Sequence, residues 1–160
     1  MIEYVTRIDD FWTDELKSFV FPHTSSAGQR DSFHSNYSKP NNDLPQAFDN
    51  EIPNYQMFSQ VLGLDNIAVS WTSIEPGQAI PIHQDAFYKL RQQHSVGVEQ
   101  CVRFLIFLQD WELGHFVEFK DFELTRWANG DVYKFDYQAI HCAANASNSR
   151  FITCQVNTIK

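Results

Sequence analysis

Two histidines and an aspartate are the residues of this sequence whose types and spacing could bind a metal ion. His83 and Asp85 stand two residues apart at the end of the apolar run Ile80-Pro81-Ile82. Side chains at positions i and i+2 of a strand point to the same face, so an imidazole and a carboxylate can converge on one point. A third ligand could come from His141, which lies in another apolar run, Ala139–Ala143. Two imidazoles and one carboxylate on one face of a metal suit non-haem Fe(II), because the opposite face stays open for chemistry.

Two arginines could bind an anion beside such a metal. Arg150 follows His141 by nine residues and opens the last apolar stretch, Phe151 to Ile159. An arginine on an apolar barrel face needs an anion nearby, because an unpaired buried charge is very costly. Arg103 stands inside the run Cys101–Phe107, which is otherwise wholly apolar, and could be a second anion-binding group. The alternative for Arg103 is that it snorkels outward or pairs with a structural carboxylate.

Composition and charge narrow the class of protein. The 160 residues, 43% of them hydrophobic, fit one domain with a real core, which we expect to span 1–160. The net charge of -8 argues against a broad phosphate-binding surface, so we expect no nucleic-acid partner. The three cysteines are far apart in apolar runs, which indicates buried thiols in a reducing compartment. With no signal-peptide pattern and no apolar run near ~18 residues, we expect a soluble cytoplasmic protein without membrane contact.

The N-terminal part, 1–63, is expected to be helical and loop-like. Apolar residues at helical spacing predict a helix over residues 10–20, which Pro22 ends. The polar stretch His23–Gln46 predicts a long surface loop. A second short helix is predicted from about Pro53 to Leu62, with Gly63 suited to its end.

The remainder, 64–160, predicts a β-rich core. Short apolar and β-branched runs alternate with turn signals, which indicates a sandwich or barrel of antiparallel strands with the N-terminal helices outside one sheet. The segment Ala86–Gln100 is expected to be a polar loop beside the metal site. The predicted strands are Ile67–Ile74, Ile80–Asp85, Cys101–Leu108, His115–Phe119, Phe122–Trp127, Val132–Phe135, Ala139–Ala144 and Arg150–Ile159.

With these residues in view, the chain resembles the Fe(II)- and 2-oxoglutarate-dependent dioxygenases over roughly residues 67 to 158. The resemblance rests on His83-Gln84-Asp85, on His141, and on Arg150 at the expected interval. The stretch Trp127–Tyr133 also resembles the family's W-x-x-G-D turn, and Asn145 after the second histidine fits the same pattern.

The resemblance implies a mainly β fold, the double-stranded β-helix or jelly roll. It implies Fe(II) held by His83, Asp85 and His141, and 2-oxoglutarate on that iron with its far carboxylate held by Arg150. Separately from the resemblance, Arg103 is expected as a second anion-binding group that touches 2-oxoglutarate or an acidic substrate. It further implies hydroxylation of a C–H bond in a small molecule or peptide side chain, with succinate and CO2 released and ascorbate as a supporting reductant.

Other interpretations stay open at this point. His83 and Asp85 could be a surface turn pair, His141 a satisfied core histidine, and Arg150 an exposed arginine at a strand start. A cupin-like metal-binding protein without oxygenase activity, an isomerase or a ligand sensor, would have no need of an interior Arg150. A nucleic-acid demethylase of the same superfamily is disfavoured by the acidic balance. His23, His34, His94 and His115 are not expected to be ligands, and Trp71 and Trp127 are expected to be core residues.

Overall fold

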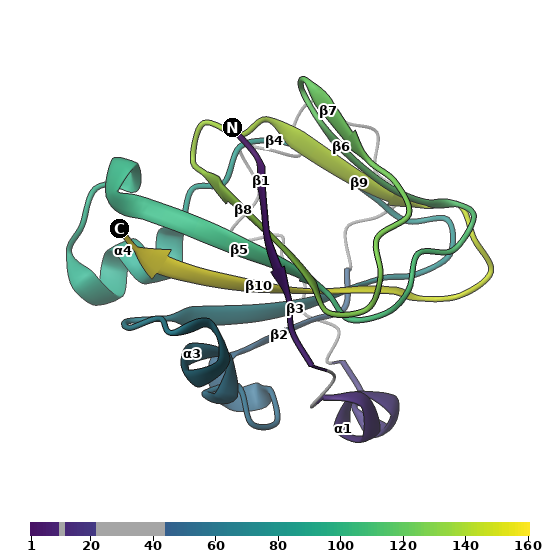
Figure 1. Cartoon of the computed structure of the whole chain (residues 1–160), viewed down its shortest axis with the longest axis horizontal. Helices are drawn as coiled ribbons and strands as arrows, with labels where there is room; N and C mark the ends of the chain where they lie inside the picture. The colour runs from purple at the N-terminus through teal and green to yellow at the C-terminus, as the bar shows by residue number, and fades with distance from the viewer. Residues whose placement is uncertain (10–11, 22–43) are drawn as a thin grey trace.

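Antiparallel strands make up most of the structure, a computed structural model that describes residues 1–9, 12–21 and 44–160 (Figure 1). Six strands form the larger sheet and four form the smaller one. The order in the larger sheet is β1 (Glu3–Arg7), β8 (Asp131–Asp136), β5 (Cys101–Phe107), β10 (Phe151–Ile159), β3 (Ala68–Ile74) and β2 (Gln46–Phe48). The order in the smaller sheet is β4 (Ala79–His83), β9 (His141–Asn145), β6 (His115–Phe119) and β7 (Phe122–Leu124).

The chain passes from one sheet to the other at nearly every connection between β3 and β10. From β3 to β10, only β6 and β7, which form a hairpin, are consecutive neighbours in one sheet. This path places β9 between β4 and β6, and β10 between β3 and β5. Eight strands wound in this way form a jelly roll, as predicted.

The helices are short and lie outside the sheets (Figure 1). They are α1 (Thr13–Ser18), α3 (Met57–Leu62) and α4 (Tyr88–His94), with single 3-10 turns at Asp49–Glu51 and Val98–Gln100. Gly63 ends α3 in the left-handed conformation, with a φ of 64°, which glycine adopts without a steric penalty. No helix in the described part of the chain is long and apolar enough to cross a membrane.

Two large apolar clusters lie on opposite faces of the six-stranded sheet. The outer cluster joins the even-numbered residues of β10 to N-terminal residues such as Trp12, Phe21 and Phe58. The inner cluster lies between the two sheets and contains Phe151 of β10. Successive residues of a strand face opposite sides, so β10 is buried on both faces. The expected packing of N-terminal residues on the outside of one sheet is confirmed.

Stacked aromatic rings fill one end of the space between the sheets. Phe107 lies 4.0 Å from Trp127 between ring centroids, and Trp127 lies 5.2 Å from Phe151. The neighbouring turn is held by Gly130, whose φ is 87° and whose backbone bonds Ile8 and Phe107. A Cβ at Gly130 would lie 2.2 Å from the Ile8 carbonyl oxygen, so this turn requires glycine.

The sequence-based element boundaries need several corrections. The predicted strand Ile80–Asp85 ends at His83, so Asp85 lies in the segment that follows β4. β1 and β2 were not predicted, and both add to the edges of the larger sheet. The segment Ala86–Gln100 contains α4 and is not only a loop, because Leu90 is buried against the end of the larger sheet. The end of the predicted loop His23–Gln46 is also wrong, since Leu44 is buried and Gln46 belongs to β2. Residues 22–43 of that loop, and residues 10–11 of the predicted first helix, lie outside the described residues.

Candidate metal centre

The three predicted metal ligands converge on one point inside the jelly roll. His83 Nε2 lies 3.6 Å from Asp85 Oδ1, and His141 Nε2 lies 3.8 Å from Asp85 Oδ2. The candidate ligand atoms of all three residues lie within 4.8 Å of one another. Asp85 and His141 are buried, and His83 is partly buried.

Strand pairing explains why these residues meet. His83 ends β4 and His141 begins β9, and the two are direct partners in the smaller sheet. Their rings lie 4.2 Å apart between centroids, which is the close approach of directly opposed antiparallel residues. The register between β4 and β9 shifts between Ile80 and His83. Such an irregularity re-aims the side chain that follows it.

Each imidazole is oriented by the backbone just before it. His83 Nδ1 lies 2.9 Å from the Pro81 carbonyl oxygen, and His141 Nδ1 lies 3.1 Å from the Ala139 carbonyl oxygen. A carbonyl can only accept, so Nδ1 carries the proton on both rings. The lone pair of each imidazole is therefore on Nε2, the atom that faces Asp85. Metal-binding histidines are commonly fixed by a hydrogen bond of this kind.

Asp85 stays ionised although it is buried. Burial alone would raise the pKa of its carboxyl group, but Arg103, His83 and His141 together hold that pKa well below its usual range. Arg103 Nη1 lies 2.8 Å from Asp85 Oδ2. Oδ2 nevertheless accepts no hydrogen bond from the described residues, so the contact is an ion pair with off-line geometry. An anionic carboxylate with spare lone pairs is what a cation requires of this position.

His141 is kept neutral by its surroundings. Burial lowers its pKa to about 4, and the nearby Asp85 carboxylate only partly opposes that effect. The Phe119 and Phe135 rings lie 5.3 and 5.0 Å from the imidazole and 5.0 Å from each other, so the three rings pack as one cluster. A neutral imidazole is the form that coordinates a metal.

The donor set fits a first-row divalent metal. Ligands at right angles around a metal with bonds of about 2.1 Å stand about 3 Å apart. The candidate ligand atoms lie within 4.8 Å of one another, so they would move inward when a metal binds. Imidazole nitrogens with one carboxylate oxygen are the donors that Fe(II) uses in open sites.

Comparison with known proteins supports the fold at low sequence identity. No family model matches the sequence, and neither does any curated protein. One similar solved structure is SnoK, a non-heme alpha-ketoglutarate-dependent carbocyclase from nogalamycin biosynthesis. It is 9% identical in sequence, and the two structures superpose over 99% of this chain and 79% of SnoK with a TM-score of 0.63. EvdMO1 is 13% identical, with 99% of this chain covered at a TM-score of 0.60, and this chain spans 47% of EvdMO1.

The chain has the double-stranded β-helix fold. Identities of this size establish the fold alone, and the strand order described above agrees with it. Within the β-helix, His83 and His141 come from the smaller sheet, whereas Arg103 reaches Asp85 from β5 in the larger sheet.

Arg150 does not share the interior of the β-helix with the other three residues. It is exposed, and its guanidinium carbon lies 6.0 Å from the ring of Phe21, which belongs to the outer cluster. β10 begins at Phe151, whose ring faces inward, so the preceding side chain faces outward. The expectation that Arg150 lies inside is corrected by this placement, which gives no support to its predicted contact with 2-oxoglutarate. The alternative of an exposed arginine at a strand start describes the structure.

Arg103 occupies the interior position instead. Its Nε donates to Asn157 Oδ1 at 2.9 Å, and its guanidinium carbon lies 5.5 Å from the ring of Phe87. Phe87 has a φ of 49°, a left-handed conformation that is costly for an aromatic residue and recurs at functional sites. Neither Asn157 nor Phe87 was predicted. The register Asn157↔Arg103 could have revealed the first, while no sequence signal marks the second.

A buried polar layer, also not predicted, continues from Arg103 into the β-helix. Gln155 Oε1 accepts hydrogen bonds from Ser70 at 2.9 Å and Thr72 at 3.2 Å, and its Nε2 donates to Thr153 at 2.6 Å. Gln46 Nε2 in turn donates to Thr72 at 3.4 Å. These side chains share the face of the larger sheet that carries Arg103 and Asn157. The interior is therefore polar near the candidate metal and aromatic at the opposite end.

The remaining histidines agree with expectation where they can be seen. His115 is buried among aromatic rings, 4.8 Å from the Phe151 ring, and bonds Ser147 away from the triad. His94 ends α4. His23 and His34 lie outside the described residues. Trp71 and Trp127 are core residues of the outer and inner clusters.

Proposed function

We propose that the chain is an Fe(II)- and 2-oxoglutarate-dependent dioxygenase that hydroxylates an unactivated C–H bond of a small molecule or peptide side chain. The observation that supports this most is the convergence of His83, Asp85 and His141 on one buried point, with an arginine beside them. Three protein ligands leave half of an octahedral ion open, which this reaction needs for its co-substrates.

Each residue has a defined role in this proposal. His83, Asp85 and His141 would hold the iron, with the Asp85 carboxylate offsetting part of its charge. When bound, Fe(II) and 2-oxoglutarate supply the oxidation: O2 is split, the keto acid is decarboxylated to succinate and CO2, and the second oxygen atom enters the C–H bond. The presence of Asp85, instead of a residue without a side-chain ligand, favours hydroxylation over halogenation.

Arg103 replaces Arg150 as the proposed partner of a 2-oxoglutarate carboxylate. A guanidinium has five N–H donors, and within the described residues its contacts use Nε and Nη1. The Nη2 donors remain for a further anion, and a planar guanidinium binds carboxylates in paired hydrogen bonds. The polar layer at Gln155 would receive the remaining polar atoms of the co-substrate.

The cellular setting is part of the same proposal. The three cysteines are free thiols, as a reducing cytoplasm would keep them. The net charge of -8 supports a substrate that is not a nucleic acid.

The test is succinate formation from 2-oxoglutarate with Fe(II), O2 and ascorbate. The wild type should turn over 2-oxoglutarate slowly even without its substrate, and Asp85→Ala should not. Asp65→Ala removes an exposed carboxylate outside the triad and should keep the wild-type rate. Absence of both Fe(II) binding and succinate in the wild type would reject the proposal.

A cupin-like metal-binding protein without oxygenase activity is the second candidate. The outward position of Arg150 favours it, because the arginine expected from the resemblance is missing from the interior. Anaerobic addition of 2-oxoglutarate to the Fe(II) protein separates the two. A new visible absorption band from keto-acid chelation supports the oxygenase, whereas metal binding without such a band supports the second candidate.

A further inference from the structure

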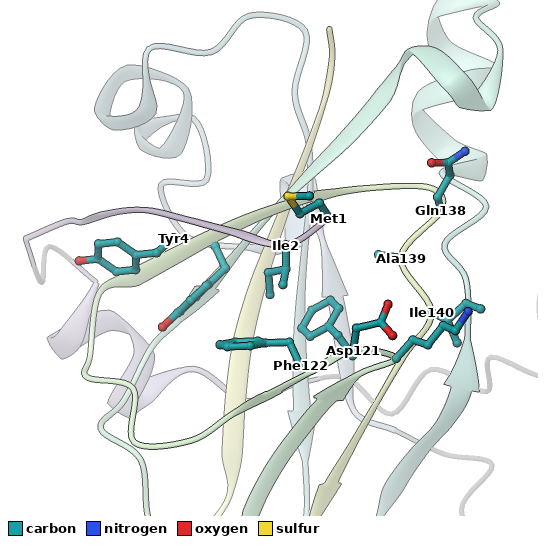
Figure 2. A pocket seen from close by; sticks show the side chains of 11 residues that line it. Met1, Ile2, Tyr4, Asp121, Phe122, Gln138, Ala139 and Ile140 are labelled. Atoms are coloured by element: carbon teal, nitrogen blue, oxygen red, sulfur yellow. The ribbon is translucent and has the colours of Figure 1, made fainter.

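A cavity of about 710 Å3 opens between the N-terminal strand and the β6–β7 hairpin, close to the start of β9 (Figure 2). Figure 2 shows Ile2 entering it from one side, with Phe122 and Asp121 opposite and Ala139 and Ile140 along a third wall. Its volume is in the range of small-molecule sites, about 300–1,000 Å3. None of its lining residues is one of the three candidate metal ligands.

The wall of this cleft is shared with the metal centre. Phe119 lines the cleft, and its ring stacks on His141 at 5.3 Å between centroids. Ala139 also lines it, and its carbonyl oxygen accepts the hydrogen bond from His141 Nδ1. One residue therefore separates a molecule in the cleft from a proposed iron ligand.

Two aromatic side chains that line the cleft are half exposed. Tyr4 is 51% exposed and Phe122 is 50% exposed, and both line the cleft. Exposed aromatic rings around a concave site offer apolar surface to a partly apolar ligand.

Charge is concentrated at one end of the cleft. Lys120 and Asp121 are neighbours at the β6–β7 turn, and Gln138 faces the cleft from the segment before β9. Within the described residues neither Lys120 nor Asp121 forms an ion pair. A ligand with one charge would meet one attractive and one repulsive group there, whereas a ligand with both charges would meet two attractive ones.

We propose that this cleft binds a small molecule with a flat apolar body and an end that carries both an ammonium and a carboxylate group. The apolar body would lie against Phe119, Phe122 and Tyr4, with its charged end at Lys120 and Asp121. That this molecule is the one oxidised at the metal rests on the proposed function above. The binding itself does not.

The first experiment measures binding without turnover. The protein loaded with Zn(II) is titrated calorimetrically with three ligands. L-phenylalanine carries both charges, phenylacetate carries only the negative charge, and phenethylamine carries only the positive charge. L-phenylalanine should bind about two- to five-fold more tightly than either analogue, the size expected for solvent-exposed ion pairs. Lys120→Met should weaken L-phenylalanine and phenylacetate but leave phenethylamine unchanged. Equal affinities for all three ligands, or no binding, would overturn the proposal.

A pair of matched variants locates the binding. Phe122→Ser removes half-exposed apolar surface inside the cleft, and Leu113→Ser removes surface that is 84% exposed outside it. Phe122→Ser should weaken L-phenylalanine at least five-fold, and Leu113→Ser should have no effect. Equal effects of the two variants would show that the ligand binds elsewhere.

The role as substrate site is tested separately by replacing Zn(II) with paramagnetic Mn(II). The proton NMR signals of bound L-phenylalanine should broaden, because the cleft wall contacts His141. Binding without broadening would refute the substrate role. Failure of the protein to bind either metal, with L-phenylalanine binding intact, would reject the proposed oxygenase function and leave the cleft assignment standing.

Discussion

Replacing Arg103 with methionine should destabilise the metal-free protein by about 3–5 kcal/mol at pH 7. The ion pair it forms with Asp85 is desolvated, with side chains 16% and 7% exposed, and removing one partner of a buried pair costs this much. The loss has an upper limit, because Asp85 can become protonated in place of staying charged and unpaired. Neutralising a carboxyl with the ordinary pKa of 3.8 costs about 4.4 kcal/mol at pH 7.

The pH dependence of this loss has a definite sign. In the wild type the pKa of Asp85 is depressed, so its contribution to stability is complete above pH 3.8 and is lost only at lower pH. Without Arg103, burial raises that pKa above the value in the unfolded chain, so the folded variant gains protons and relative stability as the pH falls. The difference between the two proteins should therefore shrink from pH 7 to pH 5, by at most about 1.36 kcal/mol per unit.

Urea denaturation with a chelator at pH 7 and pH 5 measures these differences, and Arg150→Met is the matched control. Arg150 is exposed on the outer face, so its replacement should change the free energy of unfolding by no more than about 0.5 kcal/mol. Zn(II) should narrow the gap for Arg103→Met, because the metal supplies the missing positive charge. A loss below about 1 kcal/mol, or a gap that widens toward pH 5, would refute the electrostatic account of the site.

Three further outcomes are expected. Asn157→Val removes the hydrogen-bond acceptor for Arg103 Nε and should weaken 2-oxoglutarate binding about ten-fold, while metal affinity changes little. Calorimetry of the Mn(II) protein measures both affinities, and equal losses of the two would contradict a positioning role. The metal-free protein should lose stability as the pH falls from 6.5 toward 4, because His141 takes up its proton at a higher pH in the unfolded chain than in the folded protein. Urea denaturation measures this dependence, and a His141→Gln variant whose free energy of unfolding falls equally with pH would exclude this cause. Gly130→Ala should cost at least about 2 kcal/mol of unfolding free energy, because its Cβ would meet the Ile8 carbonyl oxygen, and a milder loss would mean that the turn can relax.

The three candidate metal ligands could be singled out from the sequence by their residue types and the apolar runs around them, although their meeting depends on the pairing of β4 with β9. β4 ends at His83, so Asp85 lies two residues beyond the strand and the same-face rule does not by itself place it, although the structure brings both residues to His141. The jelly roll followed from the number of short apolar runs and their turns. The strands β1 and β2 could not be predicted in this way, because edge strands of five and three residues carry little hydrophobic pattern.

The arginine assignment failed for a different reason. Arg150 has the strand parity of Ile152 and Cys154, as the sequence indicates, but that apolar side of β10 faces the outer cluster. The inner side carries Phe151 and then polar residues such as Gln155. Sequence reasoning takes the more apolar side of a strand as the interior, and here the N-terminal segment covers that side. Only the three-dimensional packing shows that Arg103 is the interior cation.

The two faces of β10 imply separate routes of change during evolution. If the interior binds the proposed co-substrate, substitutions at Thr153, Gln155 and Asn157 alter its recognition and leave the outer packing intact. Substitutions at Ile152, Cys154 and Val156 weaken the attachment of the N-terminal segment and leave recognition intact. A designer could therefore retune ligand preference and thermal resistance on alternate residues of one strand, with little compromise between them.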